Sequence, residues 1–136
     1  MSVAYFIVPE RAVPDLDSFV NGKPLAAVGN GAIDRVCRES GVRPLTEFFS
    51  EAPEEAAAFF ADQGIDPPPG GFQPERWFAA ADGLRTVQAL LARAGELTAA
   101  GPAWVAAGLP DDLRAFEVVL AGLEQAKVGW HLAVDF

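Results

Sequence analysis

The only histidine of the chain, His131, lies in its closing stretch WHLAVDF, residues 130–136. An imidazole changes charge near neutral pH, so His131 is the first candidate for acid–base chemistry. Large apolar residues alternate with small or polar ones along this stretch, which predicts a β-strand with one buried face. His131 and Asp135 then share the opposite face. Because four residues of strand span roughly 13 Å, their side chains cannot hydrogen-bond directly.

A partner for His131 must therefore come from another element, and Tyr5 in the opening strand is one candidate. His131, Tyr5 and Asp135 form the candidate catalytic set, beside a pocket near the terminal strands. The alternative is a structural histidine, half-exposed or satisfied by a hydrogen bond beside a core strand. We favour the structural role, because the strand spacing gives His131 no local partner.

Other reactive side chains are too few or too poorly placed to indicate catalysis. One cysteine and one histidine cannot form the ligand sets of common zinc sites. The acids of Asp15-Leu16-Asp17 and Asp111-Asp112 lack the spacing of a calcium loop. Cys37 falls on the apolar stripe of a predicted helix, where a cysteine is usually inert. The sequence thus predicts no metal and no cofactor, and it leans against an enzyme.

Acidic residues are concentrated in the middle of the chain. The formal net charge is −9. Residues 44–75 contain seven Asp or Glu and no Lys or Arg, so this acidic segment carries −7 of that −9. The charge opposes binding to nucleic acid, whose phosphates require clustered Lys and Arg. The segment is either a solvated, solubilising face or a docking surface for a basic protein.

The candidate partner-binding residues are acids of this segment and one tryptophan. Trp104 lies in an Ala- and Gly-rich stretch with few apolar neighbours, so it could line a partner surface. Ordinary packing is the alternative for Trp104. The candidate set is Glu47, Glu51, Glu54, Glu55, Asp62 and Trp104.

Hydrophobic patterning predicts an α+β fold, mostly helical, with about five helices packed on a small sheet. The apolar run of residues 3–8 predicts a strand that ends at Pro9. It is expected to pair with the C-terminal strand, since nothing between them is as apolar. Helices are expected near residues 30–40, 51–63, 74–78, 82–94 and 110–127, with short helical turns after Pro44 and Pro102. Asn21-Gly22 favours a type I′ turn and predicts a short edge hairpin or an ordered loop.

Composition indicates one domain spanning residues 1–136. Hydrophobic residues make up 51% of the chain, enough for a packed core without a metal or disulfide. A single cysteine fits a reducing compartment. No apolar stretch reaches the roughly 18–20 residues of a membrane helix, and the N-terminus lacks a signal-peptide pattern. A cytoplasmic location without membrane contact is therefore expected.

Four stretches of the sequence resemble a family of short bacterial proteins classed as a domain of unknown function. They are AYFIV at residues 4–8, FVNGK at residues 19–23, the stretch around Pro44 to Ser50, and the closing WHLAVDF. The resemblance implies a bacterial cytosolic protein of one domain. It implies no catalytic residue, substrate or cofactor.

Three functional hypotheses follow. The leading one is a non-enzymatic cytosolic domain that binds a basic protein through the acidic segment 44–75, as an immunity-type or regulatory protein would. The second is a small-molecule-binding protein or small hydrolytic enzyme with a pocket near His131. The third is a homodimer formed through an exposed sheet edge, and the sequence leaves both a monomer and a homodimer open.

Overall fold

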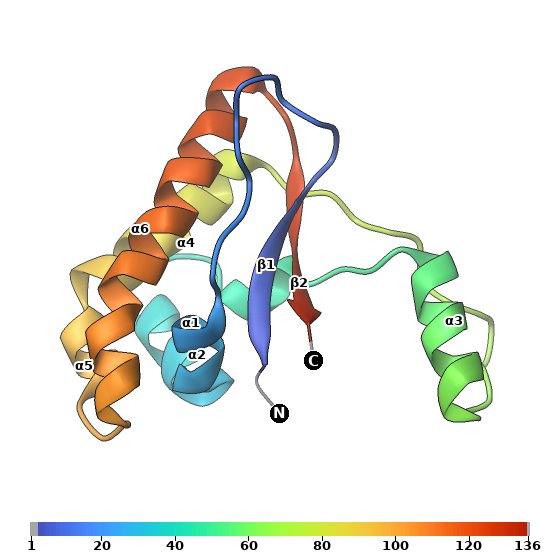
Figure 1. Cartoon of the computed structure of the whole chain (residues 1–136), viewed down its shortest axis with the longest axis horizontal. Helices are drawn as coiled ribbons and strands as arrows, with labels where there is room; N and C mark the ends of the chain where they lie inside the picture. The colour runs from blue at the N-terminus through green and yellow to red at the C-terminus, as the bar shows by residue number, and fades with distance from the viewer. Residues whose placement is uncertain (1–2, 136) are drawn as a thin grey trace.

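A computed structural model describes residues 3–135 and shows two terminal strands beside a group of helices (Figure 1). Strand β1 spans Ala4–Pro9 and strand β2 spans Trp130–Asp135. They pair antiparallel, with Val8 opposite His131. The predicted pairing of the N- and C-terminal strands is therefore confirmed. The last residue of the predicted strand, Phe136, lies outside the described residues.

Six α-helices and one 3-10 helix lie between the strands in the described part of the chain. They are α1 (Lys23–Val28), α2 (Asn30–Glu39), the 3-10 helix η1 (Leu45–Phe48), α3 (Pro53–Gln63), α4 (Ala80–Ala92), α5 (Ala94–Thr98) and α6 (Ala103–Ala126). The mostly helical α+β class is confirmed. Between residues 3 and 135, none of these helices has the length and apolar character required to cross a membrane.

The two faces of the sheet have different neighbours. The inner face is formed by the buried side chains of Tyr5, Ile7, Trp130 and Leu132. It packs against α1, α4, α6 and η1, which form the body of the molecule. The outer face is formed by Phe6, Val8, His131 and Ala133. Strand residues alternate between faces, so this division follows from the register.

Of the two alternatives predicted near Asn21-Gly22, the structure has the ordered loop and not the hairpin, and a helix begins directly after it. Residues 17–22 form no strand, and α1 starts at Lys23. Gly22 has a φ of 71°, and its carbonyl accepts a hydrogen bond from the Tyr5 N–H at 3.1 Å. A Cβ at Gly22 would overlap the Tyr5 carbonyl oxygen. Gly22 thus has the positive φ that the Asn21-Gly22 dipeptide indicates. This φ brings the backbone against β1 instead of forming a hairpin turn.

Helix α6 begins at Ala103 rather than at Pro110, because one helix replaces the predicted turn and the predicted last helix. A proline inside a helix costs about 3 kcal/mol, since it removes one N–H donor and crowds the preceding turn. Val105, Leu109 and Leu113 are buried before and after Pro110. Their packing outweighs the local cost and keeps the helix continuous.

Asp112 was expected at a helix start, and it instead lies inside α6 with 4% exposure. Its two carboxylate oxygens accept hydrogen bonds from the Gly22 N–H at 2.7 Å and the Leu25 N–H at 3.1 Å. Asp112 thus caps the first turn of α1 from a distant part of the chain. Burial raises the pKa of Asp112, and the hydrogen bonds from Gly22 and Leu25 act in the opposite direction.

The helix predicted to begin near Pro74 is absent, because residues 71–77 have no regular secondary structure. Phe78 forms an isolated antiparallel bridge with Trp130, with N–H···O distances of 2.8 and 3.0 Å. The Ser50 N–H donates to the Leu132 carbonyl at 3.2 Å. These short pieces of backbone cover the edge of β2 that faces away from β1.

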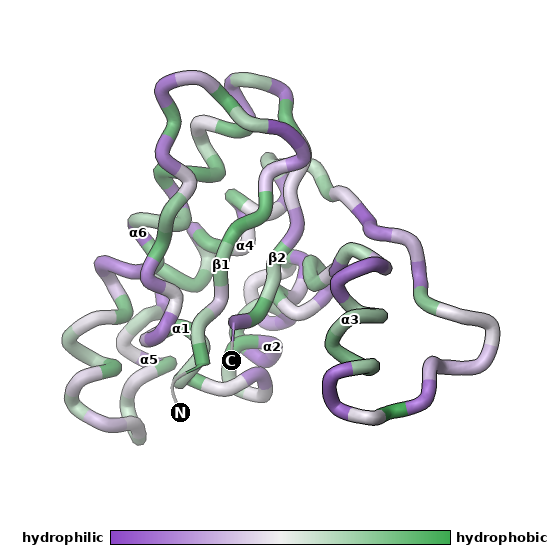
Figure 2. Tube along the Cα trace, turned by 45° about the vertical axis from the view of Figure 1, so that its right-hand side comes forward, coloured by the Kyte–Doolittle hydropathy of each residue, from purple (hydrophilic) through white to green (hydrophobic). Residues whose placement is uncertain are grey.

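Helix α3 stands apart from the body (Figure 1). Ala56 is its only buried residue, and Phe59 is half exposed. Phe60 packs edge-on against Phe72 in the return loop, with ring centroids 5.0 Å apart. Figure 2 shows α3 and this loop beside the sheet, and we call residues 51–73, which include the two residues before α3, the arm. The arm is held mainly by its own contacts and by its two connections to the body.

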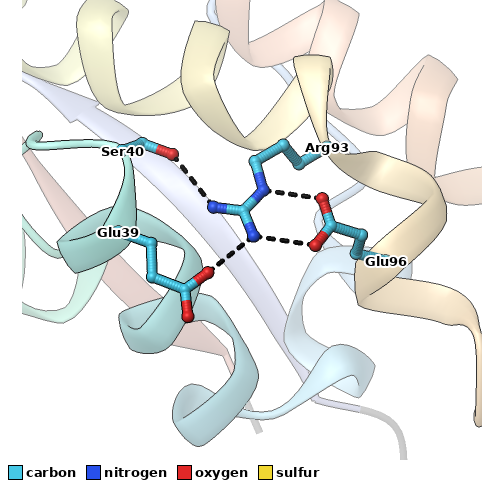
Figure 3. Close-up of polar contacts among 4 residues, drawn as sticks. All are labelled: Glu39, Ser40, Arg93 and Glu96. Carbon is cyan, nitrogen blue, oxygen red and sulfur yellow. Dashed lines mark hydrogen bonds and ion pairs between the residues drawn. The ribbon is translucent and has the colours of Figure 1, made fainter.

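Two acids of the helical body, Glu39 and Glu96, pair with Arg93. The Arg93 guanidinium contacts Glu96 at 2.6 and 2.7 Å, Glu39 at 2.6 Å and the Ser40 hydroxyl at 3.4 Å (Figure 3). Hydrogen bonds to Glu96 and Glu39 raise the pKa of Arg93, and the Arg93 hydrogen bond lowers the pKa of Glu96. This cluster ties the end of α2 to the junction of α4 and α5.

Candidate functional site

A hollow of about 550 Å³ lies beside the outer face of the sheet and is bordered by the start of the α3 arm. Its apolar lining comes from both strands and from the residue after η1, and consists of Phe6, Val8, Phe49, Ala133 and Val134. Its polar lining consists of Ser50, Glu51, Glu55, Glu75 and His131. We call this site the acidic hollow, because three of its five polar lining residues are glutamates.

His131 lies at the wall of the acidic hollow and is 2% exposed. The alternation of the strand places it away from the core, and residues 75–77 bury it from the other side. The Trp77 ring packs on the imidazole with centroids 4.9 Å apart. His131 Nε2 lies 2.7 Å from Glu75 Oε2. The histidine is thus satisfied, as the structural interpretation of the sequence predicts.

Both ring nitrogens of His131 face oxygen acceptors, since Nδ1 lies 3.1 Å from the Leu132 carbonyl oxygen. A neutral imidazole carries one N–H, whereas an imidazolium carries two and could donate to both oxygens. Glu75 would then be its counter-ion. With both nitrogens engaged, none is directed at a reacting group. Ser50 in the same hollow accepts a hydrogen bond from the Arg76 N–H at 2.7 Å.

The three candidate catalytic residues do not come together. Tyr5 lies on the inner face, where its hydroxyl donates to Asn30 Oδ1 at 2.6 Å. Burial raises the pKa of Tyr5, with a smaller contribution from the negative charge of Asp34. Asp135 lies on the outer face with His131, but it is exposed and does not line the acidic hollow. The partner of His131 is Glu75, which is 56 residues away in the chain.

The five acids named as partner-binding candidates fall into three groups. Glu51 and Glu55 line the acidic hollow. Glu54 and Asp62 are exposed on α3 and do not line it. Glu47 pairs with Arg43 at 3.3 Å. Only two of the acids named as partner-binding candidates therefore border the same cavity.

Trp104 and Cys37 lie outside the acidic hollow. Trp104 is 56% exposed near the start of α6, at the end of the body opposite α3 (Figure 1). It therefore forms no joint surface with the acidic segment. Cys37 is fully buried in α2, and burial raises the pKa of its thiol. A buried, protonated thiol is inert, as the sequence predicts.

The carboxylates of the arm differ from those of the body in their charge balance. Across residues 3–135, neither Glu51 nor Glu55 makes an ion pair, and Glu54 and Asp62 make none either. By contrast, arginines of the body pair with Glu39, Asp82, Glu96 and Asp111. Solvent and mobile ions thus balance the charge of the arm, and a cationic ligand could replace them.

The chemistry open to the acidic hollow is recognition of positive charge. In the described residues, no group of three or more His, Cys, Asp and Glu side chains is placed to hold a metal ion.

Glu75 is the residue that sequence reasoning missed, because it was counted only among the seven acids. Its place beside Trp77 gives no sequence signal for a contact with His131.

Comparison of the chain with protein-family models, curated proteins and solved structures finds no significant match.

Proposed function

We propose that this protein is a non-enzymatic, cytoplasmic binding protein whose acidic hollow receives a basic side chain of a partner protein. The supporting observation is the meeting of three carboxylates, from Glu51, Glu55 and Glu75, with an apolar surface in one cavity. An arginine or lysine has the complementary form, because its aliphatic stem packs on apolar surface while its charged end reaches acceptors. A guanidinium can also engage a carboxylate through two parallel hydrogen bonds.

The surrounding charge favours the same class of partner. The acidic segment contributes −7 and contains no base of its own. A patch of one sign speeds the encounter with a partner of the opposite sign, and salt weakens this effect. The same charge disfavours nucleic acid as the partner, since its phosphates would be repelled.

A hydrolytic role for His131 is the weaker proposal. Its observation is that Ser50, His131 and Glu75 line one cavity. A serine nucleophile needs a histidine nitrogen free to take its proton. Here the two nitrogens face Glu75 and the Leu132 carbonyl. Catalysis would first require the loss of one of these contacts.

The proposal is tested by fluorescence anisotropy with a labelled peptide that carries one arginine beside a leucine, at low and at high salt. We expect saturable binding that weakens as salt is raised. Glu51→Gln combined with Glu55→Gln should weaken binding about tenfold or more, because both carboxylates that line the cavity without an ion pair are neutralised.

The matched control is Glu54→Gln combined with Asp62→Asn, which removes the same charge from the same arm outside the acidic hollow. This control should retain most of the affinity. Equal losses in both double variants would mean that only the general field of the arm matters. Absence of binding by the unmodified protein at low salt would contradict the proposal.

A further inference from the structure

A second hollow of about 710 Å³ adjoins the acidic hollow across the outer side of the sheet. Its wall is the segment 17–23, which runs beside β1. Phe6 and Val134 line both hollows. The two hollows thus share a border at Phe6 and Val134, and we call the pair of hollows together the outer groove, with Phe6 at its middle.

The outer groove has an apolar centre and acidic ends. Phe6 is 37% exposed at the centre, and Phe19 on the far wall is 77% exposed. Aromatic surface of this kind, left open beside polar groups, is typical of an interaction site. Glu51 and Glu55 lie at one end, and Asp17 and Asp135 line the other. Among residues 3–135, Lys23 is the one Lys or Arg that lines either hollow.

We propose that the partner contributes an extended segment that crosses the outer groove, with an apolar side chain on Phe6 and a basic side chain at each end. This inference rests on the proposed function, since it extends the same site. An extended chain directs every second side chain to one face, so basic, apolar and basic residues at alternate positions all point into the groove. The floor contacts the central residue, and the two acidic ends hold the flanking cations.

A second copy of this chain is a poorer occupant of the groove. A symmetric contact places the same patch of both subunits face to face. Each copy would then bring four acids, Glu51, Glu55, Asp17 and Asp135, to the contact and only one lysine, Lys23. Like charges that meet across an interface oppose association. The charge of the groove therefore selects a basic partner rather than itself.

The test compares labelled peptides that carry one arginine beside a leucine with peptides that carry a second arginine two, four or six residues from the first. In the unmodified protein, at least one spacing should bind about tenfold more tightly than the one-arginine peptide. Asp17→Asn combined with Asp135→Asn should remove this gain and leave the one-arginine peptide unaffected. The Oδ1 atom of Asp17 accepts the Phe19 N–H at 3.0 Å, and an asparagine side chain keeps this acceptor, so the wall of the groove is preserved.

The matched control is Asp15→Asn combined with Asp111→Asn, which removes two exposed charges outside the groove and should keep the gain.

Phe6→Thr should weaken the binding of every peptide, because the aromatic centre of the groove is lost. No gain at any spacing, or a gain that persists without Asp17 and Asp135, overturns the extended segment while leaving one-arginine binding intact. Absence of one-arginine binding by the unmodified protein would instead contradict the proposed function. A dimer in light scattering that Phe6→Thr dissociates would show that a second copy fills the groove, and it would also overturn this inference.

Discussion

The inner and outer faces of the same two strands bury their side chains by different means. On the inner face, Trp130 stacks on Phe48 with centroids 5.0 Å apart and lies against Gly83 of α4. On the outer face, Phe6 is 37% exposed, and Trp77 and Glu75 bury His131. The inner face is packed for stability. On the outer face, the contact with Glu75 buries His131, whereas Phe6 stays in contact with solvent. Such an open apolar surface suits recognition of a partner.

The largest expected difference between the faces comes from truncating one aromatic residue on each. Trp130→Ala should lower the free energy of unfolding by about 3–5 kcal/mol, because it leaves a cavity in a fully packed layer. Phe6→Ala should lower it by about 1 kcal/mol or less, since the ring is already in contact with solvent. Urea denaturation of both variants measures the two costs. Similar costs would mean that the two faces are packed alike.

A second difference concerns glycine in the helical layer. A Cβ at Gly83 would overlap the Trp130 indole, so Gly83→Ala should destabilise the protein by about 1–3 kcal/mol despite the better helix propensity of alanine. Gly95 in α5 has no atom within 4 Å of such a Cβ. Gly95→Ala is therefore the control and should be neutral or stabilising in the same thermal-melting experiment. A neutral Gly83→Ala would mean that Trp130 can move.

The contribution of the His131–Glu75 contact to stability is tested by a double-mutant cycle on these two residues. His131→Ala should lower the free energy of unfolding by about 1–3 kcal/mol, because Glu75 loses its hydrogen-bond partner. Together with Glu75→Ala and the double variant, the cycle should give a coupling of at least about 0.5 kcal/mol in urea denaturation. If His131→Ala abolished an activity without any loss of stability, the structural role of His131 would be refuted.

The smallest expected effect is a pH dependence of the unfolding free energy that comes from Asp112 in α6. Burial raises the pKa of Asp112, so the folded protein keeps this proton where the unfolded chain releases it. The stability that this proton contributes is present below the ordinary Asp value of about 3.9 and is lost as pH rises through the raised pKa. The unfolding free energy of Asp112→Asn should therefore fall less than that of the unmodified protein over this window. Equal pH slopes in the two proteins would contradict the shift.

Local patterns were sufficient for much of the fold. The alternation of residues 130–136 and the apolar run before Pro9 predicted both strands, and the helical stripes predicted α2, α3 and α4 nearly in place. Local patterns failed where the same sequence signal is compatible with two different structures. A positive φ at Gly22 serves a hairpin or a close approach equally well, and Pro110 starts a helix or lies within one. Contacts with Tyr5 and burial of the flanking leucines decided these two cases.

By itself, the sequence determined the α+β class, the pairing of the terminal strands, the burial of Cys37 and the separation of His131 from Asp135 along the strand. It also located the acidic segment, because charge is a sum over residues that needs no coordinates. Only the tertiary structure decided that Glu75 meets His131, that Glu51 and Glu55 face a cavity while Glu54 and Asp62 do not, and that Tyr5 is turned away. These are contacts between residues far apart in the chain. They depend on packing and strand register, which no local pattern records.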